Sequence, residues 1–232
     1  YAAYLGEQTP TPPFLCLLVS GGHSALYRVE SSTQLELLGQ TRDDAAGEAF
    51  DKGARMLGLG YPGGVAIDRL SRPGNREQYE FPIPMKHSKD LDFSFSGLKT
   101  SLRQLLLSRP SLPEGNDLHD LCASYQEAIA NALLSKTRKA LDTTGIKKLV
   151  VAGGVASNHR IRVLMEEMAI EKQVEVTLVP LKYCTDNAAM IGTAALGAPE
   201  SSWMQPGDPK ALNLDASPSI PIQQAFGGST PP

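Results

Sequence analysis

Two Gly-Gly pairs, each following an apolar segment, are the first residues of this chain whose types and spacing could do chemistry. One lies in Ser-Gly-Gly at residues 20–22, after the apolar run 14–19, and the other lies at residues 153–154, after the run 147–152. Glycine permits positive φ and lets a ligand approach backbone N–H groups closely, and such groups bind phosphate oxygens. The second pair also precedes a helix expected to begin near Ser157, whose N-terminus favours an anion. The two pairs indicate either a nucleotide site or two tight turns.

Polar side chains near these turns could bind the rest of a nucleotide. Asp51 and Asp68 each lie on a predicted helix beside a glycine-containing turn. A carboxylate there can accept hydrogen bonds from ribose hydroxyls, and the alternative is a solvated helix surface. Asn158 follows the second Gly-Gly pair and could either cap a helix or bind adenine or ribose. The chain contains neither GxGxxG nor GxxxxGK[ST], which disfavours Rossmann and P-loop folds.

Metal chemistry has weaker support in the sequence. Asp186 could be a ligand of a hard metal ion, although the same residue could simply cap a helix, and one carboxylate does not make a metal site. The chain has no HExxH motif, and its histidines share no ligand spacing; they are His23, His87, His119 and His159. A zinc hydrolase contained within this chain is therefore not expected.

A mixed α/β fold must position these residues. Short apolar or alternating segments predict strands at 14–19, 24–29, 35–40, 147–152 and 174–179. Helical periodicity predicts helices at 43–57, 65–70, 97–107, 157–169 and 186–196, and a long helix after residue 116. The expected N-caps are Asp43 or Asp44 for the first helix, Asn116 for the long helix and Asp186 for the last.

Composition excludes several classes of protein. The 232 residues are 41% hydrophobic and 20% charged, as in an ordinary globular protein, so disorder over most of the chain is not expected. The net charge of −3 means that a nucleic acid would have to bind through a local basic patch. No apolar run reaches the ~18 residues of a membrane span. The three distant cysteines suggest reduced thiols, and we expect a cytoplasmic protein.

The chain divides into three parts on these patterns. Residues 1–13 are predicted to be a helix remnant and linker, residues 14–197 the main domain with a helical insertion around 70–140, and residues 198–232 a Pro-rich tail. The opening segment YAAYLGE is similar to the last turns of a helix, so we expect a further segment upstream of Tyr1.

Five motifs in order resemble the tRNA N6-adenosine threonylcarbamoyltransferase family, also called TsaD or Gcp and once described as glycoprotease-like. They are LLVSGGHSAL, DDAAGEAFDKGARMLGLGYPGG, LDFSFSGLKT, VVAGGVASNHRIR and YCTDNAAMIG, and the resemblance covers residues 5–196. It implies the actin/hexokinase/Hsp70-like (ASKHA) ATPase fold, mainly its second lobe. The residues it places at the nucleotide are Leu18, Val19, Ser20, Gly21, Gly22, Asp51, Gly64, Asp68 and Asn158.

The resemblance also implies a reaction and its cofactors. The family transfers a threonylcarbamoyl group from threonylcarbamoyl-AMP to the N6 amine of the anticodon-adjacent adenosine in tRNAs that read ANN codons. Asp186 matches the family's carboxylate ligand for one divalent metal, iron or zinc, and the partner His pair is expected upstream of Tyr1. This chain alone is therefore expected to be inactive. The implied partners are tRNA, a paralogous dimer partner and a pathway ATPase, with no membrane.

Other functions remain open from the sequence. An inactive scaffold paralogue is disfavoured because Asp51, Asn158 and Asp186 are all present. Another ASKHA kinase or carbamoyltransferase would share the fold, since fold alone does not fix function. No residue is identified as a general base. The basic clusters that could contact tRNA are Lys86/Lys89, Lys99/Arg103, Lys136/Arg138/Lys139 and Arg160/Arg162.

Overall fold

The fold is built on a five-stranded mixed sheet, seen in a computed structural model that describes residues 1–198 and residue 208. The strands are β1 (Phe14–Val19), β2 (Ser24–Val29), β3 (Leu35–Gln40), β4 (Lys148–Ala152) and β5 (Glu175–Leu178), in the order β3-β2-β1-β4-β5. The predicted Pro-rich tail lies outside the described residues, apart from residues 198 and 208.

The pairing of β1 with β4 brings the two Gly-Gly turns together. β1 runs antiparallel to β2 and parallel to β4, with Leu18 opposite Ala152. Parallel neighbours end at the same edge of a sheet. The approach is so close that a Cβ on Gly153, whose φ is +97°, would lie 2.2 Å from the carbonyl oxygen of Val19. Only glycine fits at that position.

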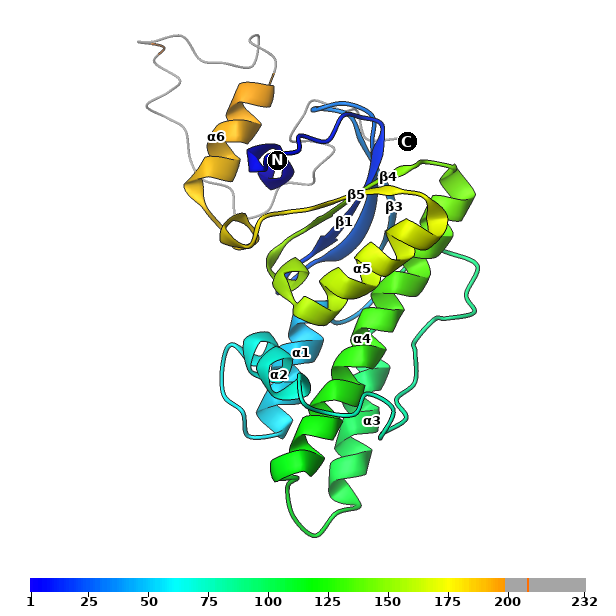
Figure 1. The fold of residues 1–232 in the computed structure, drawn as a ribbon, viewed down its shortest axis with the longest axis vertical. Coiled ribbons are helices and arrows are strands. Elements are labelled where there is room, and N and C mark those ends of the chain that lie inside the picture. Colours follow the sequence, from blue (N-terminus) through cyan, green and yellow to red (C-terminus); the bar gives the residue numbers. More distant parts are fainter. Residues whose placement is uncertain (199–207, 209–232) are drawn as a thin grey trace.

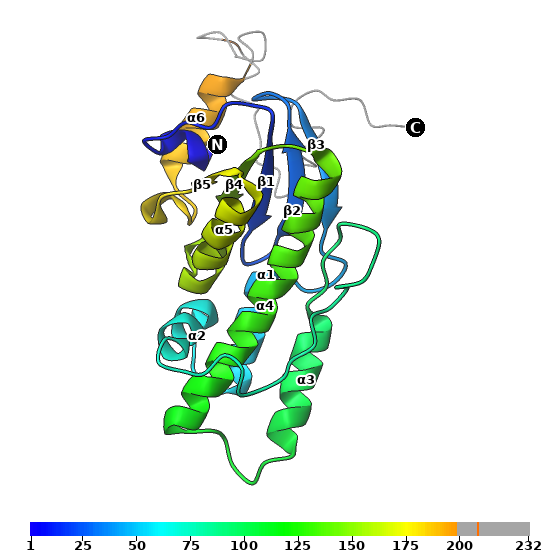
Figure 2. The same ribbon diagram turned by 45° about the vertical axis from the view of Figure 1, so that its right-hand side comes forward.

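The described residues also form six α-helices. They are α1 (Ala46–Met56), α2 (Gly63–Ser71), α3 (Ser96–Leu107), α4 (Gly115–Thr144), α5 (His159–Lys172) and α6 (Ala188–Gly197), with 3₁₀ turns η1 (Ala2–Leu5), η2 (Gly154–Ser157) and η3 (Leu181–Tyr183). Figures 1 and 2 show a helical half containing α1, α2 and α3, and a half containing the sheet. The long helix α4 spans both halves and passes beside α5.

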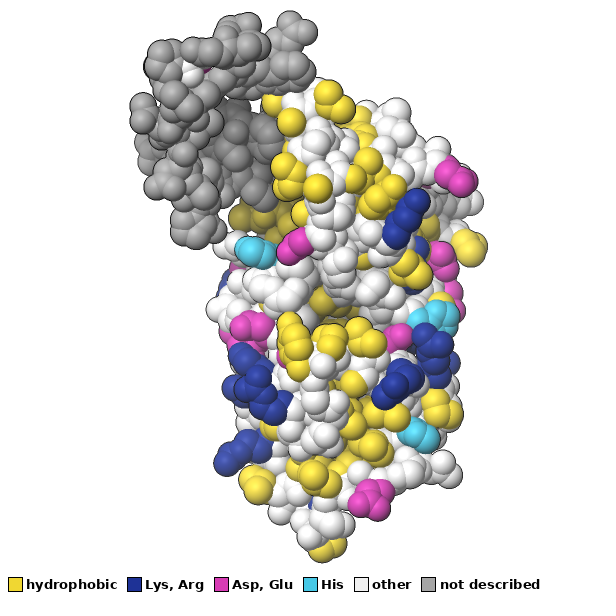
Figure 3. Space-filling view, turned by 90° about the vertical axis from the view of Figure 1, so that its left-hand side faces the viewer, with side chains coloured by type: hydrophobic (Ala, Val, Ile, Leu, Met, Phe, Trp, Pro, Cys, Tyr) yellow, Lys and Arg dark blue, Asp and Glu magenta, His cyan; other side chains and the backbone are white. Residues whose placement is uncertain are grey.

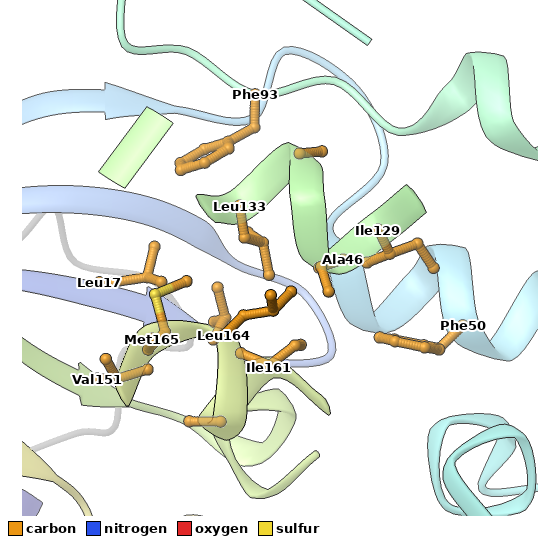
Figure 4. Close-up of a cluster of buried hydrophobic side chains, with 14 of the residues drawn as sticks. Leu17, Ala46, Phe50, Phe93, Ile129, Leu133, Val151, Ile161, Leu164 and Met165 are labelled. Atoms are coloured by element: carbon orange, nitrogen blue, oxygen red, sulfur yellow. The ribbon is translucent and has the colours of Figure 1, made fainter. Parts of the chain in front are cut away.

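One continuous core joins the two halves. Leu17 of β1 and Val151 of β4 are fully buried, and they lie beside Leu164 and Met165 of α5 (Figure 4). Leu133 of α4 continues this cluster toward Ala46, Phe50 and Ile129 of the helical half (Figure 4). The start of α1 is therefore packed against the same core as the ends of β1 and β4.

The predicted N-caps of three helices are wrong, and at α1 the reason is that both candidate carboxylates have other partners. α1 begins after Ala45, whose N–H donates to Glu48 Oε2 at 3.0 Å, while the carboxylate of Asp43 binds the start of α3. The other predicted cap of α1, Asp44, pairs with Lys52 at 2.5 Å. These carboxylates have long-range or ionic partners, which a reading of adjacent residues does not reveal.

The other two errors are shifts of one or two residues. The long helix α4 begins at Gly115 with Glu114 as its N-cap, so Asn116 lies inside the first turn. α6 is capped by Asn187, whose Oδ1 accepts from the N–H of Met190 at 2.9 Å, and not by Asp186. The predicted N-terminal helix remnant is the single 3₁₀ turn η1.

Candidate functional site

A cavity of about 440 Å³ opens at the shared end of β1 and β4. Five of the nine residues that the sequence placed at a nucleotide line it: Gly21, Asp51, Gly64, Asp68 and Asn158. Gly47, Phe50, Tyr61, Pro62, Val65, Gly154, Val155, Ser157 and Thr185 complete the lining. The cavity thus gathers residues from both Gly-Gly turns, from α1 and α2, and from the start of α5.

Three helices begin at this cavity. Gly47 lies in the first turn of α1, Gly64 lies in the first turn of α2, and Asn158 is the N-cap of α5. The N-terminus of a helix carries a partial positive charge and unpaired N–H groups, and both favour an anion. This arrangement makes the cavity suited to a phosphorylated ligand.

Contact between α1 and the first Gly-Gly turn forms one wall from backbone atoms. The N–H of Gly47 donates to the carbonyl of Ser20 at 3.3 Å. A Cβ on Gly47 would lie 2.6 Å from Gly21 Cα and 2.6 Å from Ser20 O. Glycine at position 47 therefore lets the helix start touch the turn directly.

Asp51 ties α1 to α2 across the cavity. Its Oδ1 accepts from the N–H of Gly63, the first residue of α2, at 2.8 Å. A Cβ on Gly63 would lie 2.7 Å from Asp51 Cα, so this close packing also requires glycine. The carboxylate is half-buried and lines the cavity, where it can also accept a hydroxyl of a ligand.

Asn158 and Asp68 are joined through a buried chain of hydrogen bonds. Asn158 Nδ2 donates to Gln126 Oε1 at 2.7 Å, and Gln126 Nε2 donates to Ser71 Oγ at 2.7 Å. Ser71 Oγ donates in turn to the carbonyl of Asp68 at 2.9 Å. Because Gln126, Ser71 and Asn158 are all buried, these bonds fix α2, α4 and α5 relative to one another.

The start of α5 is held from two sides. Asn158 Oδ1 accepts from the N–H of Ile161 at 3.1 Å, which confirms the capping alternative raised for this residue. Asp68 Oδ1 accepts from the N–H of His159 at 3.1 Å. Asn158 therefore has a structural role in addition to its place on the cavity wall.

Four of the predicted residues do not line the cavity. Val19 is fully buried, and Leu18 lies beside it in β1. Ser20 closes the turn, with its N–H donating to the carbonyl of His23 at 2.7 Å and its Oγ accepting from the N–H of His23 at 3.1 Å. Gly22 is exposed next to it. Their contact with a nucleotide stays a prediction.

Sequence reasoning missed Gly47, Tyr61 and Thr185. A glycine in the first turn of a predicted helix was the available signal for position 47, since glycine lowers helix stability and needs a packing reason. Tyr61 was signalled only by its place in the Tyr-Pro-Gly-Gly turn, and its side chain is 85% exposed beside the cavity. Nothing local distinguished Thr185.

The predicted metal ligand is a single exposed side chain. Asp186 follows Thr185 in sequence but does not line the cavity. Among the residues that the structure describes, no three His, Cys, Asp or Glu side chains are grouped so that they could hold a metal ion. The described residues therefore do not complete a metal site.

Two predicted tRNA-binding clusters are engaged within the protein. Arg160 donates to both carboxylate oxygens of Glu127, at 2.6 and 2.8 Å, with its side chain 16% exposed. Arg162 donates to the carbonyls of Ala156 and Val179 at 3.2 and 3.0 Å. These guanidinium groups hold α4, α5 and the end of β5, and the contact of the two arginines with tRNA stays a prediction.

The lysine-rich cluster on α4 is also structural. Lys136 is 2% exposed and its Nζ donates to the carbonyl of Asp90 at 3.0 Å, while burial lowers its pKa. Lys139 donates to the carbonyl of Ser88 at 2.9 Å, and Arg138 pairs with Glu171. Lys86, Lys89 and Arg103 are exposed, as is part of Lys99.

Comparison with known proteins adds to this geometry. Residues 1–193 match the tRNA N6-adenosine threonylcarbamoyltransferase (TsaD) family. The chain belongs to this family. It is 46% identical to the tRNA N6-adenosine threonylcarbamoyltransferase of Trichlorobacter lovleyi over 94% of its own length and 62% of that protein. With the protein of the same name from Anaeromyxobacter sp. (strain Fw109-5) it shares 53% identity, over 85% of the chain and 59% of the relative.

The chain covers only part of its TsaD relatives, and a solved structure shares its fold. The chain spans about three fifths of the length of these TsaD relatives. A solved structure of full-length HypF in the phosphate- and nucleotide-bound form superposes with a TM-score of 0.61 at 14% identity, over 84% of this chain and 34% of HypF. The predicted mixed α/β, ASKHA-type fold is thereby confirmed. None of the helices in the described residues could span a membrane.

Proposed function

We propose that this chain supplies the nucleotide-binding lobe of an enzyme that moves the threonylcarbamoyl group of threonylcarbamoyl-AMP to tRNA. The acceptor is the N6 amine of the adenosine next to the anticodon in tRNAs that read ANN codons. The observation that carries the proposal is the cavity at which α1, α2 and α5 all begin, between two Gly-Gly turns. Membership of the TsaD family and the nucleotide- and phosphate-bound form of HypF support it.

The cavity lining presents two chemically different kinds of group, and this difference is expected to orient the ligand. Gly21, Gly47 and Gly154 present backbone only, so they accommodate a phosphate group. Asp51 and Asp68 present carboxylates, which repel phosphate and accept hydroxyl hydrogens. The AMP part is therefore expected to lie with its phosphate at the glycines and its ribose at the carboxylates.

This orientation suits the expected reaction. The adenosine amine attacks the carbamoyl carbon, the bond from that carbon to the phosphate oxygen breaks, and AMP leaves with the negative charge. Backbone N–H groups and helix N-termini that already face the phosphate stabilise the charge that forms on it. The chain's own residues thus bind and orient the donor, and a paralogous partner protein and an ATPase of the same pathway are proposed to assist the complete enzyme.

Nucleotide titration tests the proposal. AMP is titrated into the chain and into Asp51→Asn, with Glu36→Gln on the edge strand β3 as a control of equal charge change. Loss of a hydrogen bond to a charged group, on the order of 1–3 kcal/mol, should weaken AMP binding in Asp51→Asn roughly fivefold to a hundredfold and leave the control unchanged. Equal affinity in all three proteins would remove Asp51 from the site, and no AMP binding by the unmodified chain would refute the assigned cavity.

A further inference from the structure

A groove leaves the nucleotide cavity at Asp68 and follows the C-terminal end of α2. Two adjoining hollows of about 310 and 550 Å³ form it, and both are lined by Arg76 and Arg160. Asp68 lines the first hollow as well as the cavity. A polymer with one nucleotide at the cavity therefore has a continuous path along the protein surface.

The floor of this groove is electrically paired and rigid. Arg160 and Glu127 form two hydrogen bonds, and both side chains are less than one fifth exposed. Their charges cancel locally, so Arg160 shapes the groove without supplying free charge to it. Gln126, held between Asn158 and Ser71, forms another part of the floor.

Arginines open to solvent lie along the edge of the groove. Arg72 and Arg76 line it, and Arg69 lies one helical turn before Arg72, beside the groove and outside both hollows. Arg69 and Arg72 are three residues apart on α2, which places them on one face of the helix. Arg72 is 65% exposed, with a 3.4 Å contact to Asp68. Arg69 and Arg76 are exposed, and no ion pair is found for either among the described residues. Figure 3 shows this side of the molecule, where basic side chains gather below α6 on either side of hydrophobic ones.

We propose that this arginine rim (Arg69, Arg72 and Arg76) binds the phosphate backbone of tRNA beside the nucleotide that is modified. The inference rests on the proposed function and adds the docking surface. Three arginines within residues 69–76 stand out in a chain of net charge −3. Guanidinium groups bind phosphate in a bidentate manner, and such contacts set the position of a nucleic acid without reading its sequence. Asp68 at the cavity end of the groove and the exposed Glu77 in the second hollow are carboxylates, so the strongest phosphate contacts are expected at the arginines between them.

A charge-matched pair of variants tests the rim. An unmodified tRNA transcript is titrated by fluorescence anisotropy over a salt series into the full chain, into Arg69→Gln/Arg76→Gln and into a control variant. The control is Arg55→Gln/Lys147→Gln, which replaces two exposed cations outside the groove, one near the end of α1 and one just before β4. Both variants lose two positive charges, so a general electrostatic effect would weaken both equally. AMP affinity is measured on the same samples as a check of folding and of the neighbouring cavity.

The expected result separates the rim from the rest of the surface. Arg69→Gln/Arg76→Gln should lower tRNA affinity on the order of tenfold and reduce the slope of log affinity against log salt by about 2, one per lost phosphate contact. The Arg55→Gln/Lys147→Gln control should change affinity less than about twofold. Two results would overturn the arginine rim alone, provided that AMP binds normally. One is unchanged tRNA affinity in the rim variant, and the other is no tRNA binding by the unmodified chain. Loss of AMP binding in the unmodified chain refutes the proposed function instead.

Discussion

Replacing Gly47 with alanine tests whether backbone contact between α1 and the first Gly-Gly turn forms the site. The added Cβ would lie 2.6 Å from Gly21 Cα and 2.6 Å from Ser20 O. Carbon atoms in contact are normally about 3.5–4.0 Å apart, so the start of α1 must move by about 1 Å. Both neighbouring atoms belong to backbone, and neither can rotate away.

The stability change is a balance of two terms. Overpacking in a well-packed region costs about 1–3 kcal/mol, while replacing glycine by alanine in a helix returns up to about 1 kcal/mol. We expect a net loss of about 1–2 kcal/mol in the free energy of unfolding. AMP affinity should fall on the order of tenfold, because backbone donors displaced by about 1 Å lose their hydrogen-bond geometry.

Gly97→Ala is the matched control for this substitution. Gly97 also lies in the first turn of a helix, α3, but nothing lies within 4 Å of its added Cβ. It should gain up to about 1 kcal/mol of stability and bind AMP normally. Urea unfolding gives the stability of each protein, and calorimetry gives its AMP affinity. If Gly47→Ala matched Gly97→Ala in both measurements, the reasoning about the contact would be refuted.

Three further predictions follow from single residues. Burial tends to raise the pKa of Asp43, but hydrogen bonds from Ser94, Phe95 and Ser96 hold that pKa below its ordinary value. The stability that Asp43 contributes should thus be present above about pH 4 and lost as the pH falls through the lowered pKa. Urea unfolding over this pH range should show that the stability of Asp43→Asn depends less on acid than that of the unmodified chain. Asn158→Ala should lower the free energy of unfolding by roughly 2–4 kcal/mol, since it removes the cap of α5 and leaves the buried Oε1 of Gln126 without its partner. Asn187→Ala removes a cap and amide bonds to the carbonyls of Tyr183 and Thr185, but orphans no buried side chain. It should cost about 1 kcal/mol, and equal losses in the two variants would contradict the role given to Gln126. Zn²⁺ or Fe²⁺ titrated into the chain should bind equally to Asp186→Ala, because one carboxylate cannot complete a shell of about three ligands; tight binding abolished by that substitution would show that the metal site is completed within the chain.

The strands and helices could be predicted from the sequence because their signals are local. The apolar run of β1 and the helical periodicity of α1 and α4 predict those elements within a few residues. Neither the apolar segment of β1 nor that of β4 indicates by itself that the two strands pair in parallel. This pairing depends on which strand covers the free edge of β1, and that choice involves residues more than a hundred positions apart.

The candidate site shows the same contrast between local signals, which could be predicted, and long-range contacts, which could not. Glycine pairs and carboxylates beside turns could be picked out because their backbone and hydrogen-bonding properties are intrinsic to the residue type. Gly47 was missed because its requirement arises from Gly21, on another element. The ion pair of Arg160 was not foreseen because its partner, Glu127, lies on a different helix. Side chains that could act locally are visible in the sequence, whereas their competition for distant partners is not.

The same long-range contacts explain why the cavity is a stable feature of this fold. The starts of α1, α2 and α5 are each held by a group from another element: Ser20 O, Asp51 Oδ1 and Asp68 Oδ1 respectively. At α2 and α5 the holding group is a carboxylate, which takes up part of the positive field of the helix N-terminus. At α1 the carbonyl of Ser20 accepts from Gly47, and the carboxylate of Glu48 in the first turn accepts from the N–H of Ala45. Of these carboxylates, Asp51 and Asp68 line the cavity, and Glu48 does not. The phosphate is therefore expected beside the bare glycine backbone of Gly21 and Gly47, and Asp51 and Asp68 are left to face the ribose.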